Sequence, residues 1–184
     1  MNKMKALTKG MIFGFYNSVI TYFPSFTIRH FYLRKIIRVT IGKCSSVGIG
    51  CFITGRNISI GNNCVINRFC LLDGRAGIEI GNNVSISPNV SVVSLSHDKD
   101  DPQFRTVSKP VIIRDYVWIG IHALILPGVI VEKGAVVGAG AVVVKNVNEF
   151  AVVAGNPAEV ISKRNKNLTY NLKYFPIFNS DETL

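Results

Sequence analysis

Three histidines, His30, His97 and His122, are the side chains best suited to move a proton near neutral pH. His97 stands in SLSHDKDDPQFRTVSKPV, residues 94–111, where a regular aliphatic pattern gives way to polar and charged residues. A neutral imidazole can take the proton of a hydroxyl while its oxygen attacks a thioester, and can then protonate the thiolate leaving group. His97, at the edge of the break, is therefore a candidate general base. Asp98 is the adjacent candidate for holding the second ring nitrogen.

Adjacent side chains on an extended chain diverge, so a carbonyl group or Asp73 is the alternative partner of His97. His30 lies in a basic segment, and His122 lies in IGIHAL, where it faces either a groove or solvent. The polar break itself, residues 98–110, is interpreted as a projecting loop that walls an acceptor pocket. The alternative interpretation is a tolerated surface insertion.

The elements on both sides of the break repeat every six residues. Six aliphatic positions follow one another at this spacing downstream of the break: Ile113, Ile119, Ile125, Val131, Val137 and Val143. Upstream they form triplets at Ile41, Val47 and Ile53, at Ile60, Ile66 and Leu72, and at Ile80, Ile86 and Val92. Three six-residue sides close one coil, in which the aliphatic side chains point inward and stack on the next coil. The pattern predicts an all-β solenoid.

The segments LLDGRAGIEIGNNVSISPNV, SHD, DYVWIG, ILPGV, GAVVGAGAVV and VVAGNPAEVI, within residues 41–165, resemble the hexapeptide-repeat acyltransferases. The likeness is greatest to the galactoside, maltose and exopolysaccharide or capsule O-acetyltransferases. The resemblance implies a left-handed parallel β-helix over residues 41–158. Residues 1–40 are expected to form a short helical segment, and residues 159–184 an irregular or helical tail.

The resemblance also implies an acetyl-CoA donor, a sugar hydroxyl as acceptor, His97 as the catalytic base, no metal, and a homotrimer with active sites between subunits. Asp73 stands at a position that the family uses near its acceptor site, and the polar side chains of Asn67 and Arg105 are further candidates for binding the acceptor. Ile121, Ala139, Val144 and Lys145 match positions that contact the coenzyme in the family. Lys145, Lys163 and Arg164 are candidates for binding its phosphates, and Trp118 for walling its channel. Structural roles are the alternatives: Asn67 and Asp73 would shape turns, and Trp118 would pack on a corner. Glu159 and Ser162 stand where the relatives often carry Arg, so phosphate binding departs from the family pattern.

The formal net charge is +10, and residues 1–40 contain seven cations and no acid. This basic, aromatic-rich segment suits an anionic membrane surface, and the alternative is a helix that packs on the coil. The apolar run at residues 11–23 is too short to span a bilayer. No nucleic-acid-binding motif accompanies the charge. The four cysteines lack CxxC spacing. We expect a cytoplasmic location, at the inner face of the membrane if the N-terminal segment binds lipid.

Other functions remain as alternatives. A metal-dependent lyase on the same coil, like the γ-type carbonic anhydrases, needs three converging histidines, two of them typically five residues apart. Pro102 occupies the position five residues after His97, which disfavours that class. N-acetyl or other acyl transfer to a small acceptor, or a non-catalytic membrane-associated scaffold, would use the same coil.

Overall fold

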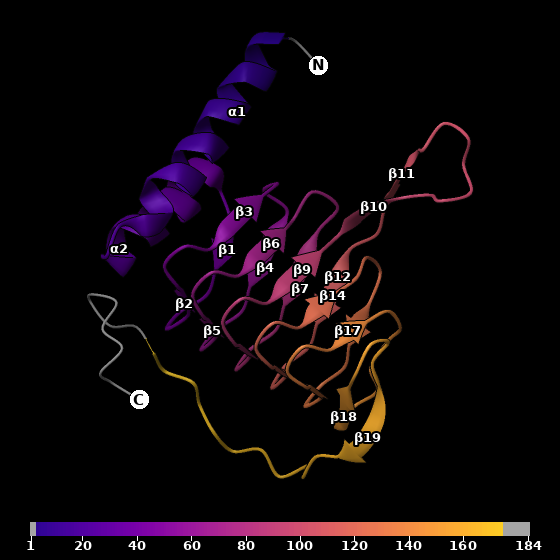
Figure 1. Ribbon diagram of the computed structural model, residues 1–184. Helices are drawn as coiled ribbons and strands as arrows, with labels where there is room; N and C mark the ends of the chain where they lie inside the picture. The colour runs from indigo at the N-terminus through magenta and orange to yellow at the C-terminus, as the bar shows by residue number, and fades with distance from the viewer. Residues whose placement is uncertain (1–2, 175–184) are drawn as a thin grey trace.

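Short parallel strands wind into a left-handed β-helix with three sheets (Figure 1). The computed structural model describes residues 3–174. The first sheet contains β1 (Thr40–Ile41), β4 (Ile58–Ile60), β7 (Ile78–Ile80), β12 (Val111–Ile113) and β15 (Ile130–Val131). The second contains β2 (Ser46–Val47), β5 (Val65–Ile66), β8 (Ser85–Ile86), β13 (Trp118–Ile119), β16 (Val136–Val137), β18 (Ala151–Ala154) and β19 (Glu159–Lys163). The third contains β3 (Phe52–Thr54), β6 (Leu71–Asp73), β9 (Ser91–Val93), β14 (Leu124–Ile125) and β17 (Val142–Val143).

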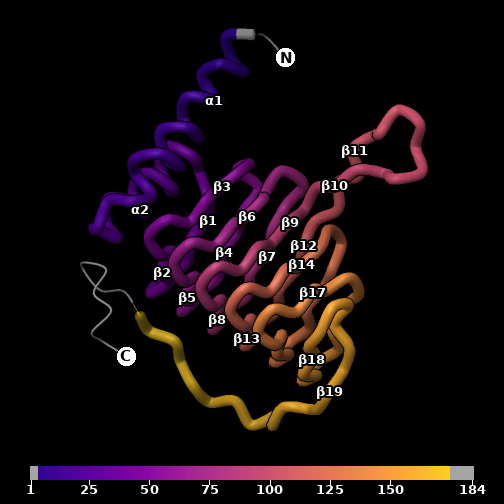
Figure 2. The backbone as a smooth tube through the Cα atoms, in the orientation of Figure 1, coloured from indigo at the N-terminus to yellow at the C-terminus, as the bar shows by residue number. Residues whose placement is uncertain are grey.

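The six-residue aliphatic positions form the core, as the sequence predicts. On the third sheet, Leu72 pairs with Ile53 on one side and Val92 on the other, and Ile125 continues the stack below Val92. Each of these side chains is at most 1% exposed. The tube view shows how the strands of successive coils stack in register along one axis (Figure 2). The coil is therefore a rigid frame whose corners present residues at fixed heights.

Close contacts between successive coils restrict the residue types at the corners. A Cβ atom added at Gly120 would lie 2.6 Å from the backbone nitrogen of Ala139 in the next coil. Such a distance is far inside van der Waals contact, so this corner requires glycine. Asn82 and Asp115 connect neighbouring coils at another corner, where the Asp115 carboxylate accepts a 2.6 Å hydrogen bond from the Asn82 backbone N–H.

Helices cap the N-terminal end of the coil (Figure 1). They are α1 (Lys3–Ser18), the 3₁₀ turn η1 (Ile20–Tyr22), α2 (Phe26–Phe31) and the π-helix η2 (Tyr32–Ile37). Asn17 hydrogen-bonds both the N–H and the carbonyl of Ile53 at 2.9 Å, and His30 Nε2 accepts the N–H of Val47 at 3.0 Å. The cap thus satisfies backbone groups of the first coil that would otherwise lack partners. None of the helices within the described residues has the length and apolarity needed to cross a bilayer.

The C-terminal segment differs in part from the expected tail. The coil was expected to end at residue 158, yet β19 pairs antiparallel with β18 and extends the second sheet to Lys163. An antiparallel return needs no six-residue period, so the repeat could not indicate it. Residues 164–174 then run back along the coil without regular structure, and the Tyr174 ring meets Phe26 of the cap edge-on, 6.5 Å between centroids. Residues 175–184 of the expected tail lie outside the described residues.

Candidate active site at the projecting hairpin

The polar break in the repeat is a β-hairpin that leaves the coil after β9. Its strands are β10 (Leu95–His97) and β11 (Thr106–Ser108), and they pair antiparallel with His97 opposite Thr106. Buried Ser94 anchors the base of the hairpin to the coil. Its hydroxyl accepts a hydrogen bond from the N–H of Ala76 at 2.9 Å, and its carbonyl accepts one from the N–H of Lys109 at 3.0 Å. Figure 1 shows the hairpin projecting well beyond the wall of the coil.

His97 therefore lies outside the sides of the coil. It stands at the outer end of a hairpin strand, and its side chain is exposed. The projecting loop expected over residues 98–110 contains a strand, β11, at Thr106–Ser108. The alternation of Thr106, Val107 and Ser108 is too short to predict a strand by itself.

Phe104 holds the imidazole of His97 in place. The Nδ1 atom of His97 lies 2.9 Å from the carbonyl oxygen of Phe104, and the two rings stack with centroids 4.1 Å apart and planes 7° apart. A carbonyl can only accept a hydrogen bond, so Nδ1 must carry the proton. In the neutral ring, Nε2 then has the free lone pair that a general base needs.

The Asp98 carboxylate hydrogen-bonds the backbone of the loop and not the His97 imidazole. One of its carboxylate oxygens accepts the N–H of Asp100 at 3.0 Å, and its own N–H donates to the Arg105 carbonyl at 2.9 Å. Such a carboxylate-to-backbone contact two residues ahead is a turn-stabilising arrangement. Arg105, predicted to bind acceptor, forms an ion pair with Asp101 at 2.9 Å. The orienting contact of His97 is thus a carbonyl, the other type of partner that the sequence left open.

The buried carboxylate of Asp73 forms an ion pair with the half-exposed Arg75 side chain at the base of the hairpin. Its carboxylate accepts two hydrogen bonds from the Arg75 side chain, at 2.8 and 2.9 Å, and one from the Thr54 hydroxyl at 2.8 Å. Burial by itself would raise the pKa of Asp73, but the bonds from Arg75 and Thr54 outweigh it and lower the pKa. Asp73 is therefore ionised and committed to Arg75, and its contacts favour a supporting role.

Asn67 links two coils: its side-chain amide donates to the carbonyl of Ile86 at 2.9 Å. Asn67 does not adopt the left-handed conformation of a turn residue, because its φ is not positive. Phe69 adopts that conformation at this corner, with φ +60°.

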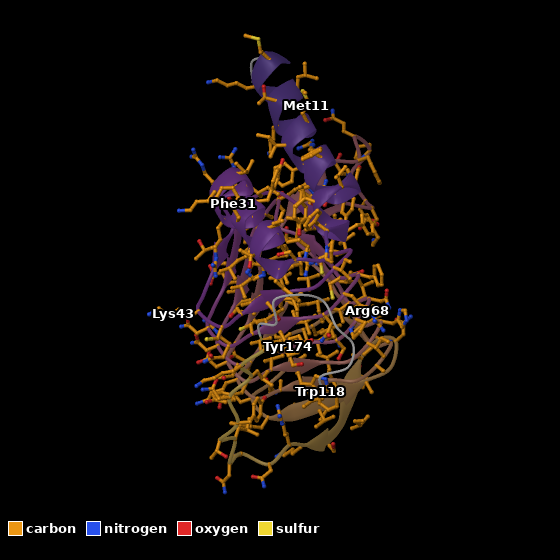
Figure 3. All side chains as sticks on the ribbon, turned by 90° about the vertical axis from the view of Figure 1, so that its left-hand side faces the viewer. Met11, Phe31, Lys43, Arg68, Trp118 and Tyr174 are labelled. Atoms are coloured by element: carbon orange, nitrogen blue, oxygen red, sulfur yellow. The ribbon has the colours of Figure 1, made fainter. Side chains whose placement is uncertain are left out.

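The predicted coenzyme residues lie on several faces of the coil. Trp118 is half exposed on the second sheet, with its indole N–H 3.3 Å from the Ser87 hydroxyl. Ile121 and Ala139 occupy the same corner in successive coils, between the second and third sheets. Val144 and Lys145 follow β17 at the corner from which the hairpin leaves two coils earlier. Figure 3 places Trp118 on the face that also carries Tyr174.

Lys163 and Arg164 differ in how they are used. Lys163 ends β19 and is exposed. The guanidinium of Arg164 donates to the Tyr116 carbonyl at 2.8 Å and to the Tyr170 hydroxyl at 3.2 Å. These bonds anchor residues 164–174 to a corner of the coil. Arg164 thus contributes to the attachment of the C-terminal segment, a role that its position beside Lys163 does not indicate in the sequence.

The site also contains residues that sequence reasoning missed. Phe104 and Ser94 position His97, and Arg75 neutralises Asp73. An aromatic residue within the polar segment DKDDPQFR was the available signal for Phe104. His122 is exposed at a corner with φ +60°, whereas His30 is buried in the cap. Among the residues that the structure describes, no group of three or more His, Cys, Asp or Glu side chains could hold a metal ion.

The fold and the site together define a class: a left-handed β-helix acyltransferase with an imidazole on a projecting hairpin. Residues 110–145 match the family model of the bacterial transferase hexapeptide (six repeats). YJL218W of Saccharomyces cerevisiae, named as an acetyltransferase, is 43% identical over 141 residues, which cover 70% of this chain and 69% of that protein. Across the curated relatives, the matched part ranges from about half to three quarters of their length.

Two solved structures carry the same architecture. A maltose O-acetyltransferase from Clostridium difficile 630 is 31% identical, with a TM-score of 0.76, and the match covers 87% of this chain and 86% of that one. The hexapeptide-repeat acetyltransferase VCA0836 of Vibrio cholerae, complexed with acetyl coenzyme A, is 27% identical with a TM-score of 0.77, over 90% of this chain and 91% of that one. The chain belongs to the hexapeptide-repeat acetyltransferase family.

Proposed function

We propose that the protein transfers an acetyl group from acetyl-CoA to a sugar hydroxyl, with His97 as general base. One observation carries the proposal: the Phe104 carbonyl binds His97 Nδ1 at 2.9 Å and leaves Nε2 able to accept a proton. The donor is supported by the relative VCA0836, which is complexed with acetyl coenzyme A, and the acceptor class by the relative named for maltose. A surface polysaccharide or its lipid-linked precursor is the acceptor that we favour.

The proposed reaction consists of one acyl transfer and two proton transfers through His97. Nε2 of His97 removes the proton from the acceptor hydroxyl while the hydroxyl oxygen forms a bond to the thioester carbonyl carbon. The carbon–sulfur bond then breaks, and the imidazolium returns the proton to the departing sulfur. The products are an acetyl ester and the free thiol of CoA. Stacking against Phe104 keeps the ring plane fixed while its charge changes.

A homotrimer with active sites between subunits completes this proposal. Val144 and Lys145 share a corner column with the hairpin, but Trp118 lies on a different sheet. Residues of one chain spread over separate faces can contribute to one site only if neighbouring chains bring those faces together. We place the enzyme in the cytoplasm, where acetyl-CoA is available, with acceptors at the inner face of the membrane.

The test is turnover of His97→Ala with labelled acetyl-CoA and a panel of glycans, amino sugars and lipid-linked sugars. We expect the variant to lose transfer while keeping its folded state and affinity for acetyl-CoA. Turnover close to that of the wild type would remove His97 from the mechanism. Transfer only to amino groups would replace the O-acetyl assignment with N-acetyl transfer. A wild-type protein without affinity for acetyl-CoA would indicate a scaffold.

A further inference from the structure

A groove between the helical cap and the first coils is lined by cations. Its larger part is a cavity of about 480 Å³ whose lining includes Lys5, Lys9, Arg38 and Arg56. A second part, about 300 Å³, shares Lys9 and is bordered by Arg75. None of the described residues lining either part is acidic. The chain contains no Asp or Glu before Asp73, and Arg75 already pairs with that carboxylate.

The groove has an apolar floor beneath these cations. Phe13 lines both parts, while Ile12 and Ile37 line the larger one, and all three pack against or belong to the core of the protein. Ile36 is 41% exposed along the same cavity. The first half of α1, which carries Lys5 and Lys9 of the lining, extends past the coil (Figure 1).

We infer that this groove binds an anionic amphiphile: a phosphate or diphosphate head group joined to an isoprenoid or acyl chain. Lysine and arginine side chains form charge-assisted hydrogen bonds with phosphate oxygens. The apolar floor removes the adjoining hydrocarbon from water, at a gain proportional to the area covered. A free nucleotide or inorganic phosphate would use the cations and leave Phe13 and Ile36 uncovered.

The position of the groove connects this ligand with the acetyl acceptor, and that connection rests on the proposed function. Asp73 pairs with Val93 in adjacent strands, so Arg75 lies beside the base of the hairpin. Val93 and His97 are four residues apart, which is at most about 13 Å of extended chain. A diphosphate held near Arg75 therefore places a sugar chain attached to it on the side of the coil from which the hairpin leaves. The ligand class is a lipid-linked sugar phosphate.

Isothermal titration calorimetry on the full chain tests the binding site without requiring turnover. The soluble probe is farnesyl diphosphate, and the comparison ligands are inorganic diphosphate and farnesol. Vesicles of phosphatidylcholine, with and without phosphatidylglycerol, test whether a bilayer supplies the same head group. We expect farnesyl diphosphate to bind at least about tenfold more tightly than either comparison ligand, because each supplies only half of the contacts. Binding by the anionic vesicles alone among the lipid probes would overturn the lipid-linked ligand and assign the groove to the bilayer surface.

Matched variants locate the binding. Lys9→Glu and Arg56→Glu reverse charges in the groove, and each is expected to weaken binding about tenfold or more. Lys35→Glu reverses an exposed charge of η2 that lines neither part of the groove, and it should have little effect. Ile36→Ser should weaken binding more than Ile28→Ser, since both residues are 41% exposed and only Ile36 lines the groove. Circular dichroism establishes that each variant is folded.

Several results would overturn the inference. Equal affinity for inorganic and farnesyl diphosphate would reduce the site to a simple anion site. Equal weakening by Lys35→Glu and Lys9→Glu would show a diffuse charge effect. A lower oligomer mass in Lys9→Glu, with farnesyl diphosphate binding unchanged, would assign the groove to a second copy of the chain. His97→Ala should bind farnesyl diphosphate normally, so a failed acetyl-transfer assignment and a failed binding site give different results.

Discussion

Replacing Phe104 with alanine tests how the hairpin positions its imidazole. The substitution removes a ring stacked 4.1 Å from His97 but retains the backbone carbonyl that accepts Nδ1–H. Aromatic pairs contribute about 0.5–1.5 kcal/mol, and Phe104 is 64% exposed, so the lower half of that range applies. If this energy holds the ring in its productive orientation, its loss lowers kcat by about twofold to fivefold.

The assay for Phe104→Ala is steady-state release of CoA thiol at saturating acetyl-CoA, together with ¹⁵N NMR of the His97 ring. We expect kcat to fall, KM for acetyl-CoA to stay constant, and the Nδ1–H form to become less populated. Phe69→Ala is the matched control, because Phe69 is also half exposed with a positive φ of 60°, at a corner away from the hairpin. An Nε2–H form in the wild-type protein, or an unchanged kcat in the variant, would refute the positioning role.

Three further predictions concern the frame that supports the site. Burial, reinforced by Arg34 and Arg29, lowers the pKa of His30 to about 4 from the usual 6.5. Between these two pH values His30 is protonated in the unfolded state and neutral in the folded state. Stability should therefore be full above about pH 6.5 and fall by about 3 kcal/mol toward pH 4, and His30→Gln should flatten this slope in urea titrations. Gly120→Ala should cost about 1–3 kcal/mol in denaturant unfolding, because its Cβ would meet the Ala139 backbone nitrogen at 2.6 Å. Gly14→Ala, in open space on α1, should instead stabilise by up to about 1 kcal/mol, and equal effects of the two substitutions would contradict the packing of the corner.

The coil could be predicted from the sequence because its core is periodic. Ile119, Ile125 and Val131 are spaced six apart, and each enters the same core one side later. The helical N-terminal segment was expected, but the contact of Asn17 with Ile53 was not, since it joins residues 36 positions apart. β19 was missed because an antiparallel return has no period of six.

The site was less predictable than the frame. His97 was found by its residue type and its place at the break, but its partner was not, because any residue of the loop can offer a carbonyl. Asp98 was the obvious candidate by adjacency, and it bonds the loop backbone instead. Arg164 was predicted to bind the coenzyme, whereas its guanidinium bonds the Tyr116 carbonyl, 48 residues away along the chain, and the nearby Tyr170 hydroxyl.

The most direct measurement is the rate of acetyl transfer from acetyl-CoA by His97→Ala, with His97→Gln beside it as a variant that cannot act as a base. The account predicts that both variants remain folded, bind acetyl-CoA as the wild type does, and lose transfer by about a hundredfold or more, the usual contribution of a positioned general base. Transfer at the wild-type rate by either folded variant would contradict the central claim that the hairpin presents His97 Nε2 to the acceptor hydroxyl.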